Sequence, residues 1–180
     1  NGNNLFPTEI SYVDPEFLDM FTFNIILGNK KSIENQGNVL LSRTMASKVF
    51  GKEYPIGKSI SIINDKNKEF TYTVGAVFED LPQNSSFRID ILTHFDNFLL
   101  MWELKDADWK MFTTAFFIQV QKKSLLISIN QSLKSYIPVQ NRAREDFRIN
   151  RFTLVPLKEV GANSRNIWSS GLYPSLHPAA

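Results

Sequence analysis

The alternation of apolar and polar residues along the chain predicts several short strands. Residues 58–63 and 70–78 are rich in Ile, Val, Thr and aromatic side chains, and the polar residues 64–68 lie between them. Two such runs joined by a short polar stretch predict a β-hairpin. Alternating or apolar runs elsewhere predict further strands. The expected strands of the first half are 10–13, 38–41, 58–63, 70–78 and 87–92.

Two helices are predicted between these strands. Asp14 and Pro15 favour a helix start that leads to about Phe21, because Asp caps free N–H groups and Pro suits the first turn. Ser42 is a predicted N-cap of the second helix, and Gly51 is a predicted stop. The apolar face of that helix is formed by Met45, Ala46, Val49 and Phe50.

The pattern changes after about residue 95. Residues 96–110 predict a helix followed by a loop, and residues 112–120 and 147–155 predict strands. Ser124 is expected to cap a helix that Pro138 ends. The apolar stripe of this helix is Leu126, Ile129, Leu133 and Ile137.

This order of elements indicates the α+β class, with helices packed on a mixed or antiparallel sheet. We interpret the chain as two small subdomains. Residues 1–95 form the first, in the order β-α-β-α-β-β-β, and residues 96–180 form the second, a β-α-β portion.

Composition narrows the function classes. The 180 residues are 43% hydrophobic and carry 20 basic and 18 acidic side chains, so a folded core is expected and a dedicated nucleic-acid surface is not. Without cysteine there is no disulfide, thiol nucleophile or zinc ribbon. No apolar stretch is long enough to span a bilayer, and no leader is visible. We therefore expect a soluble piece of a larger gene product.

The loop from Gly51 to Ser59 resembles a phosphate-binding loop only superficially. Five residues instead of four separate Gly51 from Gly57, and Pro55 has no N–H to donate. A helix precedes the loop and a strand follows it, which is the reverse of the order in a phosphate-binding loop. We interpret it as a structural turn and keep nucleotide binding through Lys58 as an alternative to be tested.

An enzyme is the other alternative. Glu79 and Asp80 are adjacent carboxylates at a strand end, and paired carboxylates serve acid–base chemistry when their pKa values are pushed apart. His94 and His177 are the two histidines of the chain. No catalytic triad or metal-ligand spacing surrounds them, so we predict no catalytic, cofactor or metal residues. A small hydrolase that uses Glu79, Asp80 or His94 remains the alternative.

Arginines gather between residues 142 and 151, interleaved with Phe147, Ile149 and Phe152. We interpret this run as a solvated loop that leads into a strand. Contact with anionic headgroups or an acidic partner is the functional alternative.

An ordered series of motifs resembles a known family. Its members in this chain are residues 12–17, 20–21, Gly28, 39–42, Ala46, 50–51, 55–58, 70–77 and 80–85, with a weaker match at 155–160. Together they resemble the MacB-like periplasmic core domain of ABC-transporter permeases, in the FtsX-related class of Bacteroidetes-type bacteria. The matching positions with an implied structural role are Asp14, Pro15, Gly51, Pro55, Gly57, Lys58 and Pro82.

The resemblance implies a non-enzymatic domain at the periplasmic face of the bacterial inner membrane, between two membrane spans of a permease. Residues 96–180 would then lead toward the second span. The parent would pair with a cytoplasmic ATP-binding subunit, and with a periplasmic adaptor or lipoprotein. It would couple ATP-driven motion to export of a drug, a peptide or a lipoprotein. No catalytic residue is implied.

Overall fold

The computed structural model describes residues 7–83, 85, 87–105, 109–111 and 115–159. The chain divides into two compact units, Asn1–Lys105 and Asp106–Ala180. Each is described by itself below. The proposed division at residue 95 stays a prediction, and the helix that begins at Asp96 belongs to the first unit.

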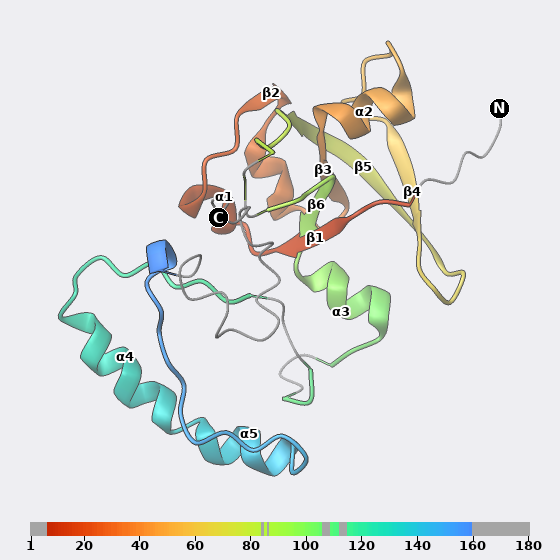
Figure 1. Ribbon diagram of the computed structural model, residues 1–180. Coiled ribbons are helices and arrows are strands. Elements are labelled where there is room, and N and C mark those ends of the chain that lie inside the picture. The colour runs from red at the N-terminus through yellow and green to blue at the C-terminus, as the bar shows by residue number, and fades with distance from the viewer. Residues whose placement is uncertain (1–6, 84, 86, 106–108, 112–114, 160–180) are drawn as a thin grey trace, which may run out of the picture. The chain divides into compact units, whose positions relative to one another are not determined.

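The first unit is built on one six-stranded sheet (Figure 1). The strands are β1 (Ile10–Val13), β2 (Ile25–Gly28), β3 (Asn38–Ser42), β4 (Ser59–Ile63), β5 (Glu69–Phe78) and β6 (Ile91–His94). Their order is β1-β6-β3-β5-β2, and β4 pairs with the first half of β5. Parallel and antiparallel pairs alternate, since β1 runs parallel to β6 and β3 to β5, while β3 is antiparallel to β6. The mixed sheet confirms the α+β class.

A bulge at Gly75 changes which residues of β5 face each side of the sheet. The register of β3 against β5 passes from Val39↔Val74 to Leu40↔Ala76, so Gly75 is the extra residue. Tyr72 and Val74 therefore belong to one hydrophobic cluster, whereas Ala76 and Phe78 belong to the other. Without the bulge all four would point to the same face, because side chains alternate along a strand.

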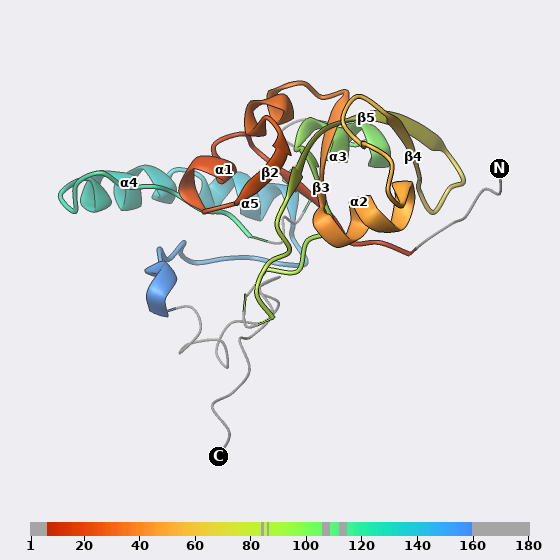
Figure 2. The same ribbon diagram turned by 90° about the horizontal axis from the view of Figure 1, so that it is seen from above.

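Helices cover both faces of the sheet. On one face, α1 (Phe17–Met20) and the 3-10 helix η1 (Lys30–Glu34) contribute Leu18 and Ile33 to the cluster around Phe78. On the other face, α2 (Arg43–Phe50) and α3 (Asp96–Trp102) bury Met45 and Met101. Figure 2 shows the sheet between α2 and η1. The central strand β3 is consequently buried on both sides, with Val39, Leu40 and Leu41 fully covered.

Ser42 caps α2 as the sequence predicts. Its hydroxyl accepts a hydrogen bond of 3.1 Å from the Met45 amide, which would otherwise lack a partner in the first helical turn. At the other end Gly51 adopts a positive φ of 62°, and its amide donates to the Ser47 carbonyl at 2.8 Å. Hydrogen bonds between residues close in sequence thus define both ends of this helix.

Replacing Ser42 with alanine is expected to lower the free energy of unfolding of the first unit by about 1 kcal/mol, the usual loss for an N-cap. Urea denaturation followed by circular dichroism measures the change. Ser47→Ala is the matched control, because Ser47 is exposed within the same helix. Since alanine is the better helix former, the control should be neutral or slightly stabilising. Equal losses in both variants would contradict the capping role.

The second unit contains α4 (Leu125–Lys134) and α5 (Ile137–Ala143). The predicted strands at 112–120 and 147–155 are wrong for the residues that the structure describes there, 115–120 and 147–155, which form no strand. The predicted β-α-β order of the second portion is therefore wrong as well. A strand needs a paired neighbour to satisfy its backbone groups. Here the Ile149 backbone is instead bonded to the Asn141 side chain, at 2.7 and 2.9 Å.

Three boundary predictions also need correction. Ser124 precedes α4, but its side chain makes no capping bond and its backbone is already helical. Pro138 does not end a helical run; it lies in the first turn of α5, where its missing N–H costs nothing. The strand predicted at 87–92 begins only at Ile91, where pairing with β1 and β3 starts.

Candidate functional site

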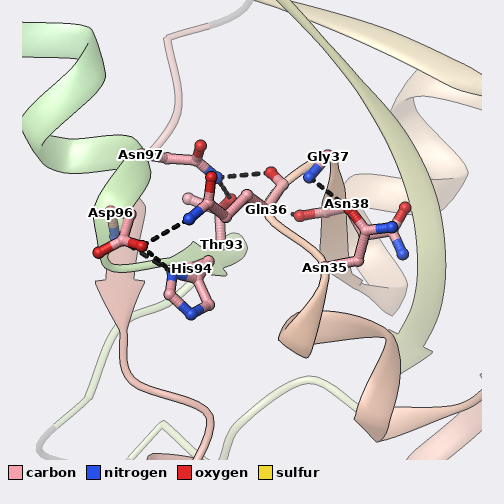
Figure 3. A network of polar contacts seen from close by, with 8 residues as sticks. All are labelled: Asn35, Gln36, Gly37, Asn38, Thr93, His94, Asp96 and Asn97. Atoms are coloured by element: carbon pink, nitrogen blue, oxygen red, sulfur yellow. Dashed lines mark hydrogen bonds and ion pairs between the residues drawn. The ribbon is translucent and has the colours of Figure 1, made fainter.

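A network of polar contacts surrounds the start of α3 (Figure 3). Asn97, only 3% exposed, donates through Nδ2 to the Gln36 carbonyl and to Thr93 Oγ1, at 2.7 Å each. Gln36 Nε2 donates to Asp96 Oδ2 at 2.5 Å. His94 Nδ1 accepts from the Asp96 amide at 3.2 Å. These contacts attach α3 to the end of β6 and to the loop before β3.

The other end of α3 is attached to the β4–β5 turn. Asn64 Nδ2 donates to the Met101 carbonyl at 2.9 Å, which satisfies a group that the helix end leaves free. Glu103 adopts a left-handed backbone and forms ion pairs of 3.5 Å with Lys66 and Lys68. These lysines, Lys66 foremost, lower the pKa of Glu103. Because the three side chains are exposed, the ion pairs orient the turn more than they stabilise it.

Tyr12 joins α3 to strand β1. Its hydroxyl donates to Met101 Sδ at 2.9 Å, and its ring lies 5.3 Å from that of Phe98. Burial, with a smaller contribution from Tyr72, raises the pKa of Tyr12 to about 12. Burial raises the pKa of Tyr72 as well. The helix is thus bound to the unit at its start, along its side and at its end.

We expect the first unit to lose stability as the pH rises above 10. The pKa of Tyr12 is raised from 10.0 to about 12, so the unfolded chain releases this proton first. The stability that neutral Tyr12 contributes is therefore fully present below pH 10 and is lost as the pH rises toward about 12. Urea denaturation at about pH 9 and about pH 11.5 measures the loss. Tyr12→Phe should weaken this pH dependence, and an unchanged dependence would contradict the assignment.

Glu79 and Asp80 bind the start of α2. Glu79 forms an ion pair with Arg43, and its amide donates to the Asn24 carbonyl at 2.8 Å. Asp80 accepts from the Thr44 amide at 3.0 Å and from the Thr44 hydroxyl at 2.9 Å. A carboxylate in this position satisfies a free helical N–H and complements the positive end of the helix. Both side chains have a structural use.

The structure does not bring these carboxylates together with His94. Phe78, which precedes Glu79, pairs with Ser42 at one end of β3. Thr93, which precedes His94, pairs with Val39 near the other end. The two ends of β3 are about 13 Å apart at the usual rise per residue. His177 lies outside the described residues. Glu79, Asp80 and His94 therefore do not share one catalytic site.

The loop from Gly51 to Lys58 is folded as a turn. Pro55 is buried, and its carbonyl accepts from the Lys58 amide at 3.1 Å. Gly57 has a φ of 81°, and its amide donates to the Val74 carbonyl at 2.8 Å. Lys58 Nζ is paired with Glu53 and lies 5.6 Å from the centre of the Phe50 ring. The Gly57 amide and the lysine, two groups that a phosphate would need, are thus already engaged.

The remaining motif residues also shape turns. The Asp14 and Pro15 carbonyls accept from the first amides of α1, at 2.9 and 3.2 Å, and the Pro82 carbonyl accepts from Ser85 at 2.8 Å. Sequence reasoning missed Gln36, Asn64 and Asn97, which hold α3. The sequence carries no local signal for these contacts, because the partners of all three side chains lie far away in the chain or become visible only in the folded sheet.

Among the described residues, two further features are absent. No group of three or more His, Asp or Glu side chains is placed there to hold a metal ion. In the same part of the chain, no helix has the length and apolarity needed to cross a membrane.

The sequence model of the MacB-like periplasmic core domain matches residues 1–136. The chain belongs to this family. The resemblance inferred from the motif series is therefore confirmed. The match includes the whole sheet and α4, whereas α5 lies beyond it.

Three solved structures that match this chain are the following. A domain described as part of a permease from Porphyromonas gingivalis is 21% identical, with a TM-score of 0.47, and the alignment covers 88% of this chain and 73% of that one. The periplasmic region of MacB from Actinobacillus actinomycetemcomitans is 17% identical, with a TM-score of 0.48 and coverages of 74% and 59%. The extracellular domain of the noncanonic ABC-type transporter YknZ from Gram-positive bacteria is 14% identical, with a TM-score of 0.45 and coverages of 76% and 64%. The chain thus spans less than two thirds of the last two. A search of curated proteins found no match.

Proposed function

We propose that this MacB-like domain is an extracytoplasmic part of an ABC-type permease and that it acts mechanically and not as a catalyst. The observation that carries the proposal is the family match over residues 1–136. The contacts of the candidate catalytic groups support it, because Glu79, Asp80 and His94 each hold a neighbouring helix.

The contacts of α3 suggest how motion passes through the domain. This helix is the last element of the first unit, and it is bound to β1, β6, the loop before β3 and the β4–β5 turn. A packed core resists continuous deformation and transmits strain. A displacement that reaches the first unit should therefore move the sheet and α3 together. Distances within the first unit should therefore stay constant while its distance to the second unit changes.

The partners follow from this role. The parent permease works with a cytoplasmic ATP-binding subunit, and the domain lies at the periplasmic face of the inner membrane. A periplasmic adaptor or lipoprotein receives the motion. The exported substrate is a drug, a peptide or a lipoprotein.

A distance measurement in the parent permease, assembled with its ATP-binding subunit, tests the coupling. The domain has no cysteine, so Lys52→Cys and Lys123→Cys place one spin label on each unit at exposed positions. We expect the distance between these labels to change between the nucleotide-free and ATP-bound states.

The matched control is a second pair of labels within the first unit, at Lys31 and Lys52, which are both exposed. This distance should remain constant through the ATP cycle. A constant distance between units would refute the coupling role. A change within the first unit would refute its movement as one body.

A further inference from the structure

We propose that His94 and Asp96 form a pH-responsive contact that controls how firmly the first turn of α3 is held. His94 is the last residue of β6, and its side chain is 18% exposed. Its Nδ1 atom lies 3.2 Å from the Asp96 amide nitrogen and 3.6 Å from Asp96 Oδ2 (Figure 3). One ring nitrogen thus faces a donor and an acceptor of the same residue.

The Asp96 amide and the Asp96 carboxylate require different protonation states of the His94 ring. The neutral imidazole carries its proton on Nε2 here, because Nδ1 must be free to accept from the Asp96 amide. When a proton from solvent binds Nδ1, both ring nitrogens become donors and the amide contact breaks. The new N–H then turns to the Asp96 carboxylate, which is already within ion-pair distance. Protonation therefore exchanges the amide hydrogen bond for a charged one.

Protonation changes only one of the two sets of hydrogen bonds that hold the start of α3. Asp96 Oδ2, the acceptor that the charged ring would approach, already accepts from Gln36 Nε2. The deeper bonds from Asn97 to Thr93 and to the Gln36 carbonyl involve no titratable group. At acidic pH the first helical turn should therefore exchange its contacts with His94 while the buried part of the helix stays in place.

Charged side chains of both signs lie on the elements around His94. Asp14 follows Val13, which is the register partner of His94 on β1. Lys30 and Lys31 begin η1 and Glu34 ends it, and this helix packs against β6. Glu103, with Lys66 and Lys68, lies at the opposite end of α3.

The contact makes α3, the last element of the first unit, sensitive to acidic pH. Histidine is the side chain whose ordinary titration falls between about pH 5 and 8. The inference rests on contacts within the first unit alone. It would stand if the permease role were refuted.

Nuclear magnetic resonance of the isotope-labelled chain, titrated between about pH 8 and 5, tests the exchange. We expect the Asp96 amide signal and the Gln36 side-chain amide signals to move with the same midpoint as the His94 ring signals. We also expect the Asp96 amide to lose about fivefold of its hydrogen-exchange protection, beyond the intrinsic effect of pH, as loss of one ordinary hydrogen bond predicts.

Two variants separate the steps. His94→Asn keeps an acceptor for the same amide without a titrating group, so the Asp96 amide should lose its pH response. Asp96→Asn removes the carboxylate, so the amide of residue 96 should still respond while the Gln36 side chain should not. An Asp96 amide that stays constant while the His94 ring titrates would overturn the proposal. The same response in His94→Asn as in the original chain would also overturn it.

Discussion

Replacing Phe78 with alanine is expected to lower the free energy of unfolding of the first unit by about 3–5 kcal/mol, the usual range for a buried phenylalanine. The Phe78 side chain is fully buried. It packs in the cluster with Leu18 and Ile33, and its ring meets that of Phe23 edge-on at 5.5 Å. Removal of the ring leaves a cavity that strands on both sides of β5 prevent from closing.

The measurement is urea denaturation followed by circular dichroism. Tyr54→Ala is the control, since Tyr54 is 63% exposed in the loop after α2 and should change stability by no more than about 0.5 kcal/mol. A loss below about 1 kcal/mol for Phe78→Ala would mean that the site collapses, and that the two faces of the sheet are packed less tightly than the structure shows.

The elements that the sequence predicts correctly are those with local causes. The β4–β5 hairpin follows from two apolar runs and a short polar turn. The bounds of α2 follow from a serine before an apolar stripe and a glycine after it. In each case the residues that decide the structure lie within a few positions of one another, so one segment contains the whole signal.

The bulge at Gly75 illustrates what a local pattern misses. Residues 70–78 read as one uninterrupted strand, and the pattern alone would place Tyr72, Val74, Ala76 and Phe78 on one face. The side of the sheet that these residues face changes at Gly75, where the register of β5 against β3 shifts by one residue. Pairing between distant strands decides this, and the sequence of β5 does not contain it.

The site shows the same limit. His94 and Asp96 are close in sequence, and their proximity is visible at once. Gln36 and Asn64 are distant from α3 in the chain, and only the folded sheet brings them to its two ends. Glu79 and Asp80 are a notable pair in the sequence, but two adjacent carboxylates can serve either acid–base catalysis or the binding of a helix start. The contacts with Arg43 and Thr44 distinguish these roles.

Gly28→Ala is expected to destabilise the first unit by about 3 kcal/mol. Gly28 has a φ of 75°, a left-handed conformation that costs an alanine roughly 1–2 kcal/mol. A Cβ added there would also lie 2.2 Å from the Gly75 carbonyl oxygen and 2.8 Å from the Ala76 Cα. Both are backbone atoms of β5, so no side-chain rotation relieves the overlap. The bulge and β2 must separate to accommodate the methyl group.

Gly57→Ala measures the cost of the left-handed backbone conformation without any steric overlap. Gly57 has a similar φ of 81°, but nothing lies within 4 Å of the Cβ that the substitution would add. It should therefore lose only the roughly 1–2 kcal/mol of the left-handed conformation. The excess loss in Gly28→Ala, measured by the same denaturation, reports the close approach of β2 to the bulge. Equal losses in the two variants would show that this close approach is absent.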